Sequence, residues 1–193
     1  MKQLAIATQN KHKIIELERM LKPLGYDVLT LYDFPELKPI VEDGDTYEQN
    51  ALIKARTLSD HAGVDAIADD SGLDVFALDG APGVHSARYA GEDVTYDDNN
   101  RLLLQNMTGV ADRRARFVTT ICLYQRGAEP RYFTGHLDGE IATRYKGTNG
   151  FGFDPIFRLP DGRHLAELAM DEKNAISHRA KALRKLIDYL HPV

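Results

Sequence analysis

Charged and polar side chains gather in three segments of the chain where a metal ion or an anion could be bound. The segments are residues 8–13, residues 69–72 and residues 173–179. Paired carboxylates at the end of a strand can hold Mg²⁺ and orient a water molecule. Lysine, arginine and histidine at the start of a helix can bind an anion such as phosphate. The three segments together indicate chemistry on a negatively charged ligand.

The first segment joins an apolar run at residues 4–7, an expected strand, to an apolar stripe at helical spacing. A helix N-terminus presents free amides and the positive end of the helix dipole, which favour a bound phosphate. Lys11 and Lys13 stand where the dipole disfavours cations, and an anionic ligand would explain them. A solvated helix start with incidental lysines is the alternative, because the glycine-rich phosphate-loop pattern is absent.

The second segment reads Asp-Asp-Ser-Gly and follows the apolar residues 64–68, which are also expected to form a strand. Adjacent residues of an extended strand point to opposite faces. We therefore expect either Asp69 or Asp70 to face a cleft while the other supports a turn at 69–72. An Asp-Ser-Gly turn with no function is the alternative reading.

Acidic residues also precede the second expected helix. Thr46 and Gln49 form a capping-box pattern that starts this helix at Thr46, just after Glu42 and Asp43. Acids in that place complement the helix dipole. Spacing alone therefore explains Glu42 structurally, and Lys54 reads as a lysine on a solvated helix face.

A glycine-rich loop and a cationic helix start complete the candidates. In residues 150–155 two glycines flank Phe151, so an exposed ring could stack on a nucleobase, although two core phenylalanines in a turn are the commoner arrangement. His178 and Arg179 open the last expected helix, where cations oppose its dipole. Surface pairing with neighbouring acids is the alternative for these two residues.

Bulk properties exclude several classes of protein. The 193 residues carry 24 Lys and Arg and 29 Asp and Glu, a net charge of −5, which disfavours a nucleic-acid polymer as partner. No run approaches the about 18 apolar residues of a membrane span, and the first apolar run is too short for a signal peptide. We expect a cytoplasmic protein. The single cysteine, Cys122, excludes an internal disulfide and is expected to be packed in the core.

Helices and strands are expected to alternate, which favours an α/β fold with a mixed sheet and a single domain over residues 1–193. The last helix is expected from a stripe formed by Ile176, Ala180, Leu183, Ile187 and Leu190. The expected strands are residues 4–7, 64–68, 73–78, 116–124 and 131–134, and a weaker helix is expected at 99–107.

Five blocks of the chain, in order, resemble the inosine triphosphate pyrophosphatase family. Any one block is weakly specific, but five in the right order cover nearly the whole chain. They are residues 8–13, which resemble the family's phosphate loop; 42–55, its second block; 68–73 with 80–89, its catalytic signature; 149–157, its base-binding loop; and 172–179, its closing block.

The chain departs from the family pattern at two positions. Gln9 stands where the family usually has Gly, which changes how closely the turn wraps a phosphate. Gln49 stands where it usually has Glu. Glutamine satisfies a capping box as glutamate does, so the fold should survive, while metal affinity would fall if that Glu helps to hold the ion.

The resemblance implies an α/β fold with a long central mixed sheet flanked by helices and two lobes with a cleft between them. It also implies a cytosolic, Mg²⁺-dependent homodimer that hydrolyses ITP, dITP and XTP to the monophosphate and pyrophosphate. By motif position, Asp70 is the proton acceptor and a metal ligand, and Glu42 is a second metal ligand. The substrate-binding residues implied are Thr8, Gln9, Asn10, Lys11, His12, Lys13, Lys54, Ser71, Phe151, Gly152, Phe153, Asp154, Lys173, His178 and Arg179.

Selectivity has a physical explanation in this assignment. Hypoxanthine and xanthine carry a 6-keto acceptor where adenine carries an amino donor, and Lys173 and Arg179 are donor-only groups. A donor facing adenine's donor would leave both groups unpaired. The alternatives are a pyrophosphatase for another modified nucleotide, such as a pyrimidine triphosphate, and a nucleotide-binding regulator without turnover.

Overall fold

The computed structural model describes residues 2–191, apart from the side chain of His12. Two compact units make up the chain. The first contains the residues up to Asp70, Thr120–Thr134 and the residues from Ala182 onward, and the second contains Ser71–Thr119 and Gly135–Lys181. Both units draw residues from β3, β5, β6 and α5, whose bounds follow.

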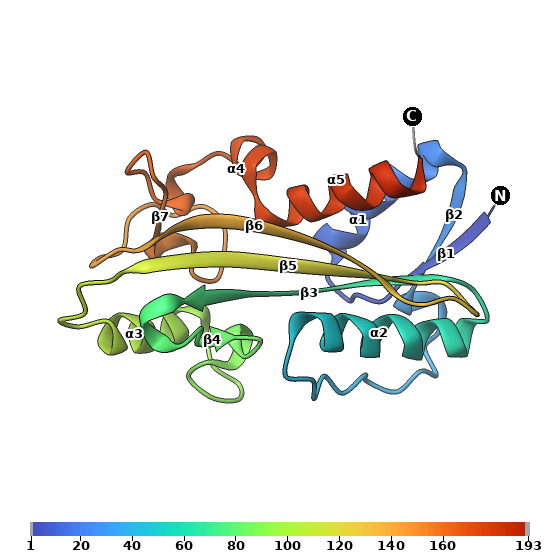
Figure 1. Ribbon diagram of the computed structural model, residues 1–193, viewed down its shortest axis with the longest axis horizontal. Helices are drawn as coiled ribbons and strands as arrows, with labels where there is room; N and C mark the ends of the chain where they lie inside the picture. The colour runs from blue at the N-terminus through green and yellow to red at the C-terminus, as the bar shows by residue number, and fades with distance from the viewer. Residues whose placement is uncertain (1, 192–193) are drawn as a thin grey trace. The chain divides into compact units, whose positions relative to one another are not determined.

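Helices and strands alternate along the chain up to β3, whereas β5, β6 and β7 are consecutive strands and α4 and α5 consecutive helices (Figure 1). The helices are α1 (Lys11–Leu21), α2 (Tyr47–Ala62), α3 (Tyr96–Asn106), α4 (Met170–Ile176) and α5 (His178–Leu190). The strands are β1 (Lys2–Ile6), β2 (Tyr26–Thr30), β3 (Ala66–Val75), β4 (Pro82–Gly83), β5 (Arg114–Tyr124), β6 (Arg131–Ile141) and β7 (Phe157–Arg158).

The strands form one mixed sheet in the order β2-β1-β3-β5-β6-β7, with β4 paired to β3. β1 pairs in parallel with β2 and β3, whereas β4 pairs antiparallel with β3 and β7 with β6. The expected α/β class with a mixed central sheet is confirmed.

Side-chain size alternates along β1 in the first unit. Leu4 and Ile6 are buried in a cluster of large side chains that includes Leu17 of α1 and Leu183 of α5. Successive strand residues point to opposite faces, so this cluster defines the face of the sheet covered by α1 and α5. In Figure 1 these helices lie on one side of the first strands and α2 lies on the other.

Small side chains cover the α2 face of the same sheet. Ala5 and Ala7 are buried together with Ala51 and Ala55 of α2, and Cys122 of β5 belongs to the same cluster. Alanine against alanine brings a helix backbone close to the strands beneath it. This close packing determines how far a polar side chain of α2 must reach to contact β3.

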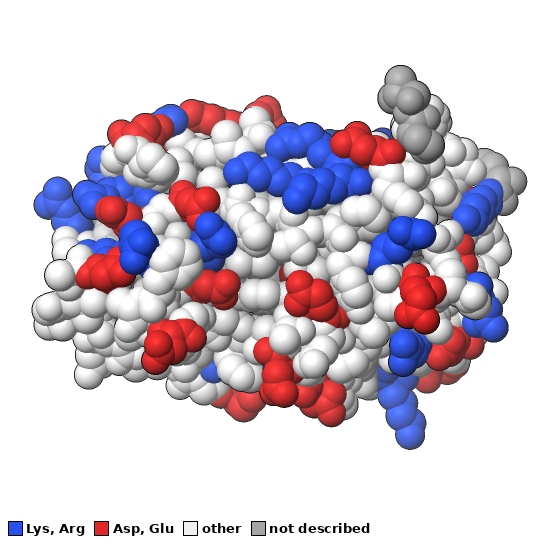
Figure 2. Space-filling model, viewed as in Figure 1, with Lys and Arg blue, Asp and Glu red and all other residues white. Residues whose placement is uncertain are grey.

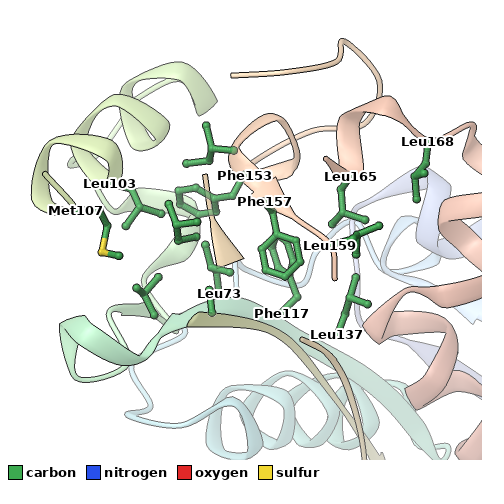
Figure 3. Close-up of a cluster of buried hydrophobic side chains, with 14 residues drawn as sticks. Leu73, Leu103, Met107, Phe117, Leu137, Phe153, Phe157, Leu159, Leu165 and Leu168 are labelled. Carbon is green, nitrogen blue, oxygen red and sulfur yellow. The ribbon is translucent and has the colours of Figure 1, made fainter. Parts of the chain in front are cut away.

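The second unit has a core of its own, built from long apolar and aromatic side chains (Figure 3). Phe117 of β5 packs on Phe157 of β7, with ring centroids 4.6 Å apart. Phe153, Leu165 and Leu168, from the segments between β6 and α4, close the same cluster. This core anchors the glycine-rich loop that the sequence assigned to a nucleobase.

One strand continues where the sequence predicted a turn. β3 runs without interruption through Asp69, Asp70 and Ser71, so the turn expected at residues 69–72 is wrong. An Asx turn needs a carboxylate that bonds to its own backbone. Both carboxylates instead contact lysine side chains of other elements, and the buried Leu73 continues the strand.

The stripe that predicted one last helix belongs to two helices. Ile176 ends α4 and packs against the core of the second unit, while α5 begins at His178. Ser177 separates them, because its hydroxyl accepts a hydrogen bond from the Ala180 N–H at 3.1 Å and so caps α5. The edge strand β2 had not been expected, since its side chains are half-buried and lack a clear alternation.

Basic side chains gather over α5 on the face drawn in Figure 2. Lys181 and Lys185 of this helix donate to backbone carbonyls of β6, at His136 and Thr134, over 2.8 and 2.6 Å. The lysines of α5 therefore have a structural explanation, because their ammonium groups donate hydrogen bonds to backbone carbonyls of the sheet. Within residues 2–191 no helix combines the length and the apolar character needed to cross a membrane.

We predict that Cys122 is unreactive in the folded protein. The thiol is fully buried, and burial raises its pKa to about 12, so the reactive thiolate is scarce near neutral pH. A chromogenic disulfide reagent at pH 8 should label no thiol in the native chain and one thiol per chain in guanidinium chloride, since the sequence has one cysteine. Rapid labelling of the native protein would contradict this packing.

Candidate functional site

The two adjacent aspartates of β3 meet lysines from two different helices. Asp69 is buried and its carboxylate lies 2.5 Å from the Nζ of Lys13 on α1. Asp70 points to the opposite face, where its Oδ1 lies 3.5 Å from the Nζ of Lys54 on α2. The predicted divergence of the two side chains is confirmed, but each one binds a cation and neither supports a turn.

Lys54 forms ion pairs with two carboxylates. Its ammonium lies 2.5 Å from Glu42 Oε2 as well as 3.5 Å from Asp70 Oδ1, and its side chain is 14% exposed. Burial alone would lower the pKa of Lys54, but the surrounding carboxylates, Asp70 foremost, outweigh burial and raise that pKa above its ordinary value. Lys54 is therefore a charged, largely buried group, and the prediction of a solvated lysine is wrong.

Asn50 is a polar residue of this cluster that the sequence placed in a motif but gave no role. The side chain is 3% exposed. Its Nδ2 donates to Asp70 Oδ2 at 3.3 Å, and its Oδ1 accepts from the Gly44 N–H at 2.8 Å. The available signal was its spacing: Asn50 and Lys54 are four residues apart on α2, which puts them on one helix face.

The start of α2 forms as predicted, with one change in detail. Thr46 Oγ1 accepts from the Gln49 N–H at 3.2 Å, while Gln49 Oε1 accepts from the Asp45 N–H at 2.7 Å. The Gln49 side chain thus bonds to the residue before the N-cap. Although this side chain is exposed, its oxygen is hydrogen-bonded to the backbone. The fold accommodates glutamine at this position.

The loop before α1 is ordered by its own polar groups. Thr8 Oγ1 accepts from the Asn10 N–H at 3.2 Å, and Asn10 Oδ1 accepts from the Lys13 N–H at 3.4 Å. The Gln9 carbonyl accepts from the Tyr32 hydroxyl at 3.0 Å. Lys11 is exposed, and the side chain of His12 lies outside the described residues. The phosphate-binding role of the loop stays a prediction.

Ser71, the residue after Asp70, belongs to the second unit. Its hydroxyl lies 2.8 Å from the Thr119 hydroxyl of β5, and either oxygen can donate. A hydroxyl that is both donor and acceptor can bind a ligand oxygen as well, so this contact is compatible with the predicted role of Ser71 and does not test it.

The glycine-rich loop divides its two phenylalanines. Phe153 is 4% exposed and packs in the core, whereas Phe151 is 50% exposed, with its ring centroid 6.2 Å from that of Tyr96. The sequence left a core turn and an exposed ring as alternatives, and the loop contains one of each. The adjacent Gly152 carbonyl accepts from the Nδ2 of Asn100 on α3 at 3.0 Å.

A buried ion pair supports the exposed ring. Lys173 Nζ bonds to Asp154 Oδ2 and lies 4.6 Å from the centroid of the Phe151 ring. Asp154 Oδ2 also accepts from the Phe151 N–H at 2.8 Å. Gly150 has a φ of +78°, and a Cβ there would stand 2.0 Å from Asp154 Oδ2. Asp154 therefore fixes both the loop backbone and Lys173.

His178 and Arg179 start α5 as predicted. The His178 ring stacks on Phe117, with centroids 5.0 Å apart and planes 10° from parallel. Both residues are half-buried. No acidic residue lies in the first turn of α5, so the helix start stays rich in positive charge. Glu172, one of the acids considered as a surface partner, lies 2.5 Å from Arg163.

A divalent ion fits the chemistry of the first unit. Within residues 2–191 no three His, Cys, Asp or Glu side chains group together as a metal centre. Glu42 and Asp70 nevertheless converge on one cation, the Lys54 ammonium. Mg²⁺ commonly takes one or two carboxylates, with water and substrate phosphates as its remaining ligands. Two carboxylates that already share a positive charge suit such a site.

Comparison with known proteins shows the family to which this chain belongs. The model of the Ham1 family matches residues 4–189. The chain belongs to the Ham1 family. Two of its similar relatives are dITP/XTP pyrophosphatases, from Exiguobacterium sp. (47% identical over 184 residues, 95% of this chain and 94% of that protein) and from Bacillus licheniformis (48% over 189 residues, 96% of each).

Solved structures of the Ham1 family have the same fold. A HAM1 protein from Coxiella burnetii superposes with a TM-score of 0.96 at 39% identity and covers 100% of both chains. The resemblance drawn from the five sequence blocks is thus confirmed at the level of family and fold. The roles of individual residues in this Ham1 family member stay predictions.

We predict that Lys173 and Asp154 depend on each other, so that loss of one partner alone destabilises the second unit of this Ham1 family member. Their side chains are 11% and 4% exposed, so Lys173→Met leaves a buried, uncompensated carboxylate. Loss of one partner of such a pair lowers the free energy of unfolding by about 3–5 kcal/mol. Urea denaturation measures the change.

The double variant Lys173→Met with Asp154→Asn is the matched control. It removes both charges and keeps an acceptor for the Phe151 N–H, so it should recover most of the lost stability. A single variant as stable as the wild type would contradict the buried pair.

Proposed function

We propose that this Ham1 family member hydrolyses dITP, XTP and ITP to the monophosphate and pyrophosphate. The names of its relatives supply the substrate class. One observation in the chain itself supports the reaction: Glu42 and Asp70 share the largely buried Lys54 ammonium. Hydrolysis of a triphosphate needs both charge compensation and a proton acceptor, and this cluster contains groups for each.

The triphosphate is assigned to the charged cluster of the first unit. Lys13 and Lys54 each have a carboxylate partner in the protein alone, so phosphate binding exchanges one anionic partner for another. The backbone amides at the start of α1 add donors in the direction favoured by the helix dipole. The two lysines hold the departing pyrophosphate in this assignment.

Asp70 is the proton acceptor in the proposed reaction. Water attacks the α-phosphorus, its proton passes to Asp70, and the bond from that phosphorus to the bridging oxygen of pyrophosphate breaks. We propose Mg²⁺ as the cofactor, held by Glu42 and Asp70. When bound, Mg²⁺ neutralises phosphate charge and lowers the pKa of coordinated water.

The base is assigned to the loop and helix start of the second unit. The exposed Phe151 ring offers a surface on which a purine can stack. Lys173 and Arg179 carry donors only, which match the 6-keto acceptor of hypoxanthine and xanthine. Adenine presents a donor at that position, so both groups would lose a hydrogen bond.

Three further properties belong to this proposal. Residues 1–193 act as one catalytic domain, the enzyme is a homodimer, and it works in the cytoplasm, where free nucleoside triphosphates are its substrates. The family resemblance supports all three.

We predict that purified protein with Mg²⁺ releases pyrophosphate from ITP, dITP and XTP much faster than from ATP. A buried donor left unpaired by adenine gives about 10⁴-fold discrimination in sites built on such pairing. An assay that separates pyrophosphate from orthophosphate measures it. Faster turnover of a pyrimidine triphosphate would identify the other modified-nucleotide activity, and binding of ITP without turnover would identify a regulator.

Asp70→Asn is the control within this assay, because it keeps the size of the side chain and removes the proton acceptor. It should retain ITP binding and lose most of the turnover. Hydrolysis of ITP at the wild-type rate by this variant would exclude Asp70 as the base.

A second prediction concerns base selectivity. Arg179→Ala should reduce the ratio of kcat/KM for ITP to that for ATP by about 5- to 100-fold, the equivalent of one buried donor–acceptor pair. Arg184→Ala, an exposed arginine on the same helix, is the matched control and should leave the ratio unchanged. Equal ratios in the wild type and Arg179→Ala would refute the donor argument.

A further inference from the structure

We propose that Asn50 is a positioning residue that orients the Asp70 carboxylate for catalysis. This inference rests on the proposed function, because it takes Asp70 as the proton acceptor. It adds Asn50 to the residues that take part in the proposed reaction. Three observations carry it: the two hydrogen bonds of Asn50, the close approach of Gly44, and the difference between a neutral and a charged donor on Asp70.

The amide of Asn50 connects two segments of the charged cluster. Its Nδ2 donates to Asp70 Oδ2 at 3.3 Å, and its Oδ1 accepts from the Gly44 N–H at 2.8 Å. Gly44 lies two residues after Glu42 in the chain. Asn50 therefore ties the backbone that carries Glu42 to the carboxylate of Asp70. At 3% exposure, the amide has little competition from solvent for either bond.

Gly44 is required for this arrangement. A Cβ at this position would stand 2.8 Å from Asn50 Oδ1 and 2.7 Å from Gln49 Cβ. Carbon atoms of real side chains do not approach neighbours so closely, so a larger residue at 44 would displace the amide. The segment before α2 is thus fitted to receive the Asn50 oxygen and to turn its nitrogen toward Asp70.

Asp70 has a neutral donor on one oxygen and a charged donor on the other. Asn50 bonds to Oδ2, and Lys54 lies 3.5 Å from Oδ1. An ammonium is repelled by any other cation that approaches the same carboxylate. An amide carries no net charge and can stay in place. Asn50 is therefore the partner that keeps Asp70 oriented while the cations around it exchange partners during substrate binding.

Asn50→Asp tests the inference directly. Asp at this position keeps an oxygen for the Gly44 N–H but replaces the donor to Asp70 by a second carboxylate oxygen, which repels it. We expect kcat for ITP, at saturating Mg²⁺, to fall about 10- to 100-fold, the loss of one hydrogen bond to a charged group. KM is compared in Gly44→Ala, which adds no charge and should keep KM within about threefold, because Asn50 is not assigned to the substrate.

A purely structural role gives a different result. The introduced carboxylate also raises the pKa of Asp70 whatever the role of Asn50, so kcat is measured along a pH profile. A wild-type kcat, or a fall in kcat that is fully recovered at high pH, overturns the proposal, because a loss of orientation does not depend on pH. A raised KM with unchanged kcat also overturns it. Calorimetry of ITP binding to Gly44→Ala without divalent metal adds a readout independent of turnover. Because this variant adds no charge, its dissociation constant should match the wild type.

Gly44→Ala provides a second variant in case Asn50→Asp does not fold. Its methyl group would collide with the Asn50 oxygen and shift the amide that donates to Asp70. We therefore expect kcat to fall and KM to stay unchanged. Wild-type kcat in Gly44→Ala would contradict the proposal. Asn106→Asp is the matched control for an asparagine-to-aspartate change, because Asn106 is exposed in α3 and bonds to the Tyr89 hydroxyl. It should retain wild-type kcat.

These measurements separate the two proposals. If the wild-type protein releases no pyrophosphate from any purine nucleoside triphosphate, the proposed function fails. If the wild type is active and Asn50→Asp is equally active, the function stands and the role of Asn50 is wrong.

Discussion

Strand geometry and buried charge act together at Asp69 and Asp70. Neighbouring side chains of an extended strand must point to opposite faces, so the two carboxylates leave β3 in different directions. A carboxylate that loses water needs a cation or several donors nearby. α1 supplies Lys13 to one face, and α2 supplies Lys54 and Asn50 to the other. The positions of both helices are tied to this pair of acids.

The glycine-rich loop of the second unit follows the same principle with different groups. Asp154 is buried, and its Oδ2 accepts from both the Phe151 N–H and Lys173. Because these bonds hold the loop backbone, the Phe151 ring stays exposed while Phe153 is buried in the core. In each unit a buried carboxylate organises a lysine, and the lysine is assigned to the substrate.

Sequence reasoning predicted what local patterns determine. It found the start of α2 at Thr46, the start of α5 at His178 and the divergence of the two aspartates, because each depends on neighbouring residues. It missed the continuity of β3 and the burial of Lys54, since both depend on partners distant in the chain. The Asn50 amide bonds to Asp70 only because the Gly44 backbone comes close to the Asn50 oxygen. No local sequence pattern predicts this close approach.

Alanines beneath α2 have a consequence for how this protein tolerates change. The helix approaches the sheet through Ala51 and Ala55, opposite Ala5 and Ala7. An extra methyl or two on any of these four would lift the helix axis outward, and with it the amide and ammonium that reach Asp70. Buried alanines thereby act as spacers for the polar groups of α2. Larger side chains at these positions would therefore disturb the contacts of Asp70 with α2.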